Sequence, residues 1–174
     1  MNKATDPRAL LEAALIDALG PECLLSAETK TLFSTDVYGE GIAPALVVRP
    51  LSQQQVADAV RIATTAGWAI TQRGGGMSYT GGYLATQPNT VMLDLSALNR
   101  VVAINEDDLV ITVEAGVTWQ QIWEALTPRG LRLPFFGTFS GSRATVGGGL
   151  SNGALFMGTA RYGSAADIVV GMEV

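Results

Sequence analysis

Apolar side chains recur with helical spacing in three segments of the chain. Residues 7–19 follow Asp6, an N-cap residue, and their leucines and alanines lie three or four positions apart until Gly20 interrupts the pattern. Residues 53–66 and 118–126 show the same spacing, and a glycine follows each of them closely. We therefore predict three helices, each with one apolar face.

The two later helices share a start signal. Ser52 and Gln55 lie three residues apart just before the first of them, and Thr118 and Gln121 have the same spacing before the second. This spacing is typical of a capping box, in which each side chain accepts a hydrogen bond from the other residue's backbone amide. We expect a capping box at both positions.

Short apolar runs bounded by proline, glycine or turn residues predict strands. The predicted strands are residues 45–49, 68–71, 90–95, 101–104, 109–114, 131–133 and 168–174. The first two flank the second helix, and this strand–helix–strand order predicts a parallel pair. The short alternating strands after residue 100 predict a mainly antiparallel sheet. The expected fold class is α+β, with two α+β subdomains.

These elements divide the chain into three regions. Residues 1–40 hold the first helix and an irregular segment, residues 41–98 the first subdomain and residues 99–174 the second. The last predicted strand runs to the end of the chain, so we expect the second subdomain to be truncated at its C-terminus. An unfinished sheet edge favours self-association or pairing with a separate C-terminal chain.

Composition narrows the class of protein. The 174 residues are 48% hydrophobic and 16% charged, which suits a well-filled core rather than a disordered chain. No run of 18 uncharged apolar residues predicts a membrane span, and the start does not resemble a signal peptide. The single cysteine, Cys23, fits a reducing compartment, so we expect a cytoplasmic protein. Cys23 itself is expected to be a small buried residue rather than a nucleophile.

The chain contains no histidine. Its absence excludes histidine-based triads and most zinc or iron sites, so we expect no metal site and expect a cofactor to carry any chemistry. The net charge of −5 argues against a nucleic-acid partner. Residues 59–93 and 125–166, however, contain arginines and no aspartate or glutamate. Both segments also contain glycine clusters, a combination that favours a bound anion such as phosphate, although chance could also produce it.

The first glycine cluster follows a predicted strand directly. It reads Arg73-Gly74-Gly75-Gly76-Met77-Ser78-Tyr79-Thr80-Gly81-Gly82. The spacing is neither that of a dinucleotide fingerprint nor that of a P-loop. Glycines still let the backbone approach a ligand closely, so the segment predicts a phosphate-binding loop, with a plain turn between strands as the alternative.

The second cluster, residues 145–153, begins a predicted helical segment. Its small residues would present free backbone amides to an anion or a flat ring, and the alternative is close packing of a helix on a strand. A glycine-bounded serine segment and two tryptophans near this cluster are not assigned to a ligand site. The segment Gly137-Thr138-Phe139-Ser140-Gly141 is not a nucleophile elbow, because its serine is misplaced and no histidine can activate it. Trp119 and Trp123 are expected in the core rather than stacked on a cofactor.

In this order, the segments resemble the flavin domain of the FAD-linked oxidase family, the PCMH type of vanillyl-alcohol oxidase and p-cresol methylhydroxylase. The residues that carry the resemblance are 44–50, 73–78, 81–82, 91–99, 113–117, 144–148, 161–163 and 167–174. It covers about residues 41–174 and is closest to the glycolate oxidase and D-lactate dehydrogenase-like members. The resemblance implies a PCMH-type FAD-binding domain of which the chain holds the N-terminal part.

The resemblance also implies which residues hold FAD. Those expected around the pyrophosphate are Arg73, Gly74, Gly75, Gly76, Met77, Ser78 and Gly81. Those expected along the pyrophosphate, ribityl chain and flavin ring are Thr145, Gly147, Gly148, Ser151 and Asn152, with Tyr162 and Gly163 closing the site and Val174 bordering the adenosine. No catalytic residue is implied. Met77 and Ser78 stand where some members carry a flavin-linked histidine, so non-covalent FAD is expected.

The resemblance implies the FAD-binding portion of a flavin-dependent oxidoreductase. In the complete protein such an enzyme would oxidise a 2-hydroxy acid or an alcohol, whereas this chain alone is expected to be inactive. One alternative is a non-catalytic truncated fragment that binds a nucleotide or a partner. Another, a nicotinamide-dependent reductase of cell-wall sugar chemistry, matches the glycine loops less closely.

Overall fold

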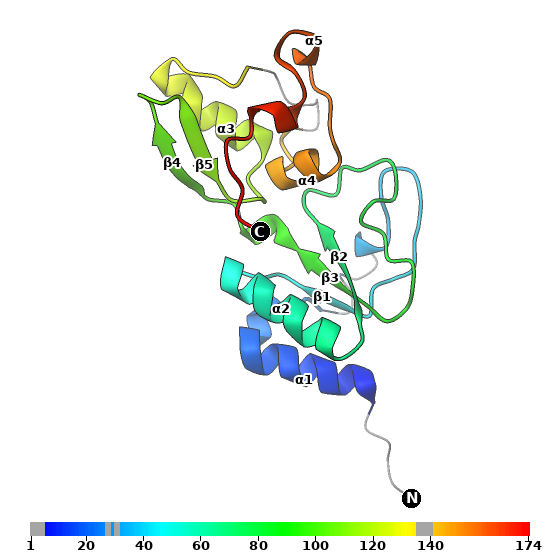
Figure 1. Ribbon diagram of the computed structural model, residues 1–174. Helices are drawn as coiled ribbons and strands as arrows, with labels where there is room; N and C mark the ends of the chain where they lie inside the picture. Colours follow the sequence, from blue (N-terminus) through cyan, green and yellow to red (C-terminus); the bar gives the residue numbers. More distant parts are fainter. Residues whose placement is uncertain (1–5, 27–28, 30–31, 135–140) are drawn as a thin grey trace, which may run out of the picture. The chain divides into compact units, whose positions relative to one another are not determined.

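The computed structural model describes residues 6–26, 29, 32–134 and 141–174 (Figure 1). Its contacts divide the chain into two units. Residues 1–73 and 78–98 form unit 1, and residues 74–77 and 99–174 form unit 2. Within the described ranges, no helix has the length and apolar character needed to cross a membrane, in line with the sequence.

Unit 1 is built on a parallel sheet of three strands. β1 (Leu46–Val48) and β2 (Ala69–Arg73) both pair with β3 (Thr90–Asp94), giving the order β1-β3-β2. The parallel direction predicted for β1 and β2 is confirmed, but these strands are not direct neighbours. All five residues of β3 are buried, and its apolar run occupies the centre of the sheet for that reason.

Both faces of this sheet are covered. α1 (Pro7–Leu19) and α2 (Gln53–Thr65) lie side by side on one face, where Leu15 and Ala59 pack with β1 and β3 (Figure 1). On the other face, Val47 and Met92 pack with Phe33 and Tyr83. Two covered faces explain why the strands are continuous apolar runs rather than alternating ones.

The first helix begins and ends as its sequence predicts. The Asp6 side chain accepts a hydrogen bond from the Arg8 amide at 3.0 Å, and the helix ends at Gly20. Cys23 follows in the short helix η1 (Pro21–Cys23), where it is buried and donates to the Leu19 carbonyl at 3.2 Å. The predicted burial of Cys23 is confirmed, and burial raises the pKa of its thiol.

The start of α2 corrects one prediction. Ser52 accepts from the Gln55 amide at 3.2 Å, but the Gln55 side chain accepts from Leu51 rather than from Ser52. The Gln55 amide group also donates to the Leu19 carbonyl at 3.0 Å, and this bond ties α2 to the end of α1. The Gln55 side chain therefore contacts the ends of both α1 and α2, and only one of the two hydrogen bonds of the predicted capping box is formed.

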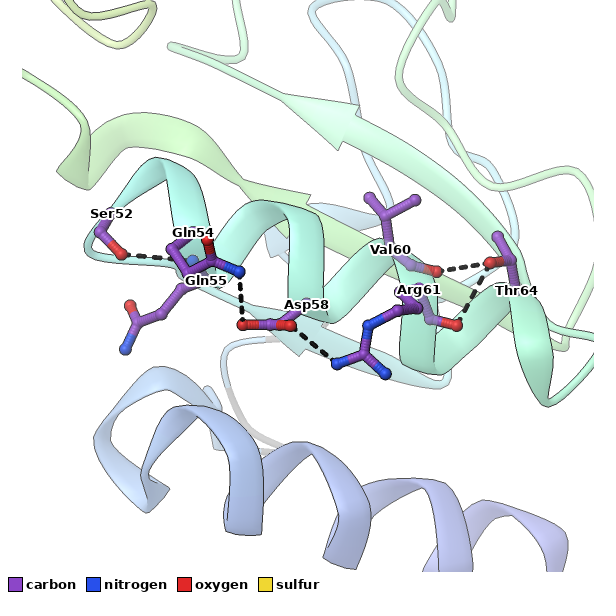
Figure 2. A network of polar contacts seen from close by, with 7 residues as sticks. All are labelled: Ser52, Gln54, Gln55, Asp58, Val60, Arg61 and Thr64. Atoms are coloured by element: carbon purple, nitrogen blue, oxygen red, sulfur yellow. Dashed lines mark hydrogen bonds and ion pairs between the residues drawn. The ribbon is translucent and has the colours of Figure 1, made fainter.

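The exposed side of α2 carries a separate polar chain. Gln54 donates to Asp58 at 3.1 Å, and Arg61 pairs with the same carboxylate at 2.7 Å (Figure 2). Thr64 closes the last turn by donating to the Val60 carbonyl. These are contacts within one helix, of the kind that stabilise it by only a few tenths of a kcal/mol per pair.

Unit 2 has an antiparallel pair of strands covered by a helix. β4 (Val101–Asn105) pairs with β5 (Val110–Val113), and α3 (Trp119–Leu126) packs on them (Figure 1). The capping box of Thr118 and Gln121 is confirmed. Trp119 lies in the core as expected, but Trp123 is 51% exposed, so its predicted burial was wrong. The remaining short helices are η3 (Leu95–Ala97) in unit 1 and η4 (Thr127–Arg129), α4 (Val146–Ser151), α5 (Thr159–Tyr162) and η5 (Ala165–Ile168) in unit 2.

Two predicted strands are absent from the described structure of unit 2. Residues 131–133 are irregular, because the Leu131 amide turns back to the Leu126 carbonyl after the left-handed Gly130. Residues 169–174 form no strand and pair with no described strand, and Ile168 belongs to η5 instead. The sheet edge from which self-association was expected is therefore not formed by these residues.

An ion pair that joins β4 to β5 gives unit 2 a defined pH dependence. Arg100 donates to Glu114 through Nε at 3.0 Å and Nη2 at 2.7 Å, and this side-chain contact lowers the pKa of Glu114 below its ordinary 4.5. A lowered folded-state pKa means that the stabilisation is full above pH 4.5 and is lost as the pH falls through the folded value.

We therefore expect Arg100→Gln to lower Tm by a few degrees at pH 7, and the difference from the unaltered chain to vanish in more acidic buffer. Thermal denaturation at a series of pH values measures this. The control is Arg132→Gln, because Arg132 makes no ion pair with any described residue. A Tm difference that persists at low pH would contradict the assignment.

Candidate functional site

The carboxyl ends of the parallel strands in unit 1 gather three charged residues. Arg49 follows β1, Arg73 ends β2 and Asp94 ends β3. Arg49 donates to Asp94 through Nε at 2.8 Å and lies 2.7 Å from it through Nη2, and Asp94 is only 1% exposed. Asp94 is thus committed to Arg49, and the charge on Arg73 is left for another partner.

Arg73 lies between two aromatic rings. Its guanidinium carbon is 4.8 Å from the centre of the Phe33 ring and 5.3 Å from that of Tyr83. The Arg73 Nε is buried and has no hydrogen-bond partner among the described residues. Arg73 also forms no ion pair with any of these residues. A buried donor without an acceptor is costly, so this position suits an anionic ligand.

The glycine loop that follows Arg73 also has unused donors. Within the described chain, the backbone amides of Gly74, Gly75 and Met77 have no hydrogen-bond partner. Gly76 adopts a left-handed φ of 69°, which favours glycine. Unpaired amides in a glycine turn are typical of anion-binding loops.

Gly74 and Gly75, which belong to unit 2, lie directly against residues 143–145 of the same unit. A Cβ atom added to Gly75 would overlap the Arg143 carbonyl oxygen, and one added to Gly74 would overlap the Thr145 hydroxyl. Gly74 and Gly75 must therefore be glycine for the two segments to touch. The structure thus brings together three residues that the sequence placed in two separate clusters.

The second glycine cluster differs from its prediction. The first amides of α4 are all used within unit 2: Val146 donates to Val117 at 2.8 Å, Gly147 to Ala115 at 2.9 Å and Gly148 to the Thr145 hydroxyl at 3.2 Å. The expectation of free amides at this helix start was wrong. The carbonyls of Ala115 and Val117, which precede α3, and the Thr145 hydroxyl accept hydrogen bonds from these amides.

Close packing explains the glycines of α4. A Cβ on Gly147 would lie 2.8 Å from the Ala115 Cβ and 2.9 Å from its carbonyl oxygen, and one on Gly149 would lie 2.9 Å from the Trp119 ring. These glycines admit the preceding segment and the core tryptophan. Ala115 and Trp119 cover one side of Gly147 and Gly149, so a ligand could reach the backbone of these glycines only from their uncovered side.

The other predicted residues of unit 2 lie at its surface. Ser151 and Asn152 are exposed at the end of α4, and Val174 is fully exposed. Tyr162 is 37% exposed in α5 beneath the Arg161 guanidinium, whose carbon lies 5.2 Å from the ring centre. Gly163 ends α5 with a left-handed φ of 82°.

Asp167, which the sequence analysis missed, shapes the turn at Gly163. It accepts from the Ser164 amide at 2.6 Å and from the Ser164 hydroxyl at 2.9 Å. A Cβ on Gly163 would lie 2.6 Å from its carboxylate. The signal was present, because serine followed three residues later by an acid is a capping spacing.

Ser78 and Gly81 belong to unit 1, where Asp36, a second residue that the sequence analysis missed, binds Gly81. Asp36 Oδ2 accepts from the Gly81 amide at 2.8 Å, while Oδ1 accepts from the amides of Tyr38 at 2.8 Å and Gly39 at 2.7 Å. Hydrogen bonds from Tyr38, then Gly39 and Gly81, lower the pKa of the Asp36 carboxyl. The sequence Asp-Val-Tyr-Gly is a turn signal that could have identified the local half of this contact.

Two other features are not part of the candidate site. The segment Gly137-Thr138-Phe139-Ser140, considered as a nucleophile elbow, lies outside the described residues. A shallow pocket of about 480 Å³ in unit 1 includes Ala45, Trp68 and Asn89, which precede the three strands. Ligands of open parallel sheets bind at the carboxyl ends, so this pocket lies at the wrong end and contains none of the predicted residues.

Comparison with known proteins gives a family match over most of the chain. Residues 44–174 match the family described as FAD binding domain. This range includes both glycine clusters and all the residues predicted to hold FAD, whereas α1 and the Asp36 turn precede it.

Similar proteins include dehydrogenases that are much longer than this chain. The mitochondrial D-lactate dehydrogenase [cytochrome] of Kluyveromyces lactis is 28% identical over 99% of this chain, which covers 31% of that protein. The D-2-hydroxyglutarate dehydrogenase of Pseudomonas putida is 33% identical over 82% of this chain, covering 14% of that protein. The chain thus spans less than a third of the length of these relatives.

Solved structures share the fold. Alkyldihydroxyacetonephosphate synthase matches with a TM-score of 0.82 and 21% identity, over 93% of this chain and 35% of that one. p-Cresol methylhydroxylase matches with a TM-score of 0.76 and 20% identity, over 88% of this chain and 31% of that one. The predicted fold class is confirmed.

Proposed function

The chain belongs to the family of FAD-binding domains, and from this premise we propose that it holds FAD in an oxidoreductase that acts on a 2-hydroxy acid. The observation that carries the proposal is the group at the start of the first glycine loop. There the buried Arg73 Nε and the amides of Gly74, Gly75 and Met77 lack partners among the described residues. The positive charge of Arg73 and the hydrogen-bond donors that follow it in the chain are suited to bind the negatively charged pyrophosphate.

The chain's residues divide the work of holding the cofactor. We propose that Arg73 binds the pyrophosphate together with Gly74, Gly75, Gly76, Met77, Ser78 and Gly81. Thr145, Gly147, Gly148, Ser151 and Asn152 would line the rest of the cofactor, with Tyr162, Gly163 and Val174 at its borders. With no histidine in the chain and Met77-Ser78 in the loop, the proposed attachment is non-covalent.

Bound FAD supplies a two-electron acceptor for the hydrogen on a substrate's hydroxyl-bearing carbon. The residues described above hold and orient that acceptor. The choice of a 2-hydroxy acid is supported by the names of the relatives, which act on D-lactate and D-2-hydroxyglutarate. The chain spans a minor part of those proteins, so substrate contacts are proposed for the complete protein.

FAD binding is the first test. We expect the purified chain, refolded or expressed with excess FAD, to quench flavin fluorescence with a stoichiometry of one and to show a perturbed flavin absorption spectrum. Riboflavin, which lacks the pyrophosphate, should bind at least tenfold more weakly. Equal binding of both flavins would remove the pyrophosphate loop from the proposal, and no flavin binding at all would overturn it.

The substrate class needs the complete protein. There we expect D-lactate or D-2-hydroxyglutarate to bleach the flavin absorption under anaerobic conditions, and the L isomers to do so much more slowly. Bleaching by simple alcohols but by neither acid would contradict the proposed class. A cytoplasmic location stays a prediction that cell fractionation would test, since some relatives are mitochondrial.

A further inference from the structure

Asp36 links two segments that lie 45 residues apart in unit 1. The two carboxylate oxygens of Asp36 accept hydrogen bonds from different segments. Oδ1 accepts from the amides of Tyr38 and Gly39 and so closes the turn in which Asp36 itself lies. Among the described residues, Oδ2 accepts from the Gly81 amide alone, at 2.8 Å, and this bond is the contact with the glycine loop.

The same two segments meet at further points. The Val37 amide donates to the Ser78 carbonyl at 3.3 Å, and the rings of Tyr38 and Tyr79 lie 5.6 Å apart. Gly81 has a left-handed φ of 69°. Glycine adopts this conformation without strain, and here the Asp36 carboxylate accepts its amide.

Oδ2 is well suited to bind Gly81, because no other group in the described part of the chain competes for it. Among the described residues, Asp36 forms no ion pair with an arginine or lysine, and its hydrogen bonds all come from backbone amides. Two acceptor oxygens are required, one for each segment. Aspartate supplies both, whereas asparagine of the same shape supplies only one.

We infer that Asp36 is a positioning residue for FAD, which fixes residues 78–81 in the conformation that accepts the pyrophosphate. The inference rests on the proposed function and deepens it. Asp36 lies outside the matched family range of residues 44–174, so the loop within that range is shaped by a residue that precedes it. Asp36 touches Gly81 rather than the cofactor and acts through it.

The test is Asp36→Asn in the full 174-residue chain. Asparagine keeps one oxygen for Tyr38 and Gly39, but its NH₂ group cannot accept from Gly81. We expect the Gly81 amide resonance to shift and its hydrogen exchange to quicken, while the amides of Tyr38 and Gly39 stay unchanged. The FAD Kd should rise about tenfold, with Tm close to that of the unaltered chain.

The matched control is Asp58→Asn on α2. Asp58 is also a hydrogen-bonded surface carboxylate, but its partners Gln54 and Arg61 lie on its own helix (Figure 2). We expect no change in FAD Kd and no shift of the Gly81 amide. Should Asp36→Asn fail to fold, Asp36→Ser replaces it, because serine closes a local turn but does not reach Gly81.

The outcomes separate this inference from the function on which it rests. If the unaltered chain binds no FAD, the proposed function fails and the inference fails with it. If the unaltered chain binds FAD and Asp36→Asn binds it equally well while the Gly81 amide shifts, only the positioning role is overturned. An unshifted Gly81 amide would overturn the contact itself.

Discussion

Replacing Gly75 with alanine is expected to destabilise the chain by about 3 kcal/mol, the upper range for forcing an atom into a packed position. The added Cβ would overlap the backbone carbonyl oxygen of Arg143. A flexible side chain could move aside, but a backbone carbonyl moves only with its segment. That segment leads into Thr145, whose hydroxyl caps α4, so the strain would reach the helix.

Urea denaturation measures the loss, and Gly171→Ala is the matched control. Gly171 has no atom within 4 Å of its added Cβ and no left-handed φ, so alanine there should leave stability unchanged. In a titration with FAD, Gly75→Ala should also show a higher Kd, because the displaced loop binds the cofactor more weakly. A Gly75→Ala chain as stable as the control would show that residues 74–77 do not pack against residues 143–145.

Replacing Arg73 with methionine is expected to move stability and FAD affinity in opposite directions. Loss of a charge-assisted contact to the pyrophosphate should raise the FAD Kd about 10- to 100-fold. The chain without FAD should keep or slightly raise its Tm, because a buried Nε that lacks a partner in the described structure is removed. Methionine can still pack between the rings of Phe33 and Tyr83.

The control for Arg73→Met is Arg61→Met, which removes the same charge from the exposed side of α2 (Figure 2). It should leave the FAD Kd unchanged. Arg73→Lys is expected to fall between Arg73→Met and the unaltered chain, since lysine keeps the charge without the planar stack on two rings. Calorimetric titration with FAD and thermal denaturation of the same samples give both quantities. A large fall in Tm for Arg73→Met would assign Arg73 to the core rather than to the cofactor.

The sequence was informative where local chemistry decides the outcome. Helix starts at Asp6 and Thr118 were predictable because a cap is a contact between neighbours in the chain. The parallel direction of β1 and β2 followed from the helix between them. The position of β3 between those strands was not predictable, since strand order depends on partners far apart in the chain.

The errors have the same origin. Residues 169–174 have the composition of a strand but no strand beside them in the described chain, and composition alone does not supply a partner. The amides at the start of α4 appeared free in the sequence because Ala115 and Val117, which accept two of them, lie about thirty residues earlier. Half of the Asp36 contact is local and could have been found, but its bond to Gly81 is long-range.

The assignment of Gly74–Met77 to unit 2 has a consequence for inheritance. These four residues are encoded with the first half of the chain but pack with the second half. A genetic exchange near residue 98 would therefore join an Arg143–Thr145 segment from one parent to a glycine loop from the other. Because the atom that meets Gly75 is a backbone carbonyl, which any residue at position 143 supplies, such hybrids should fold wherever the first half keeps a glycine at position 75.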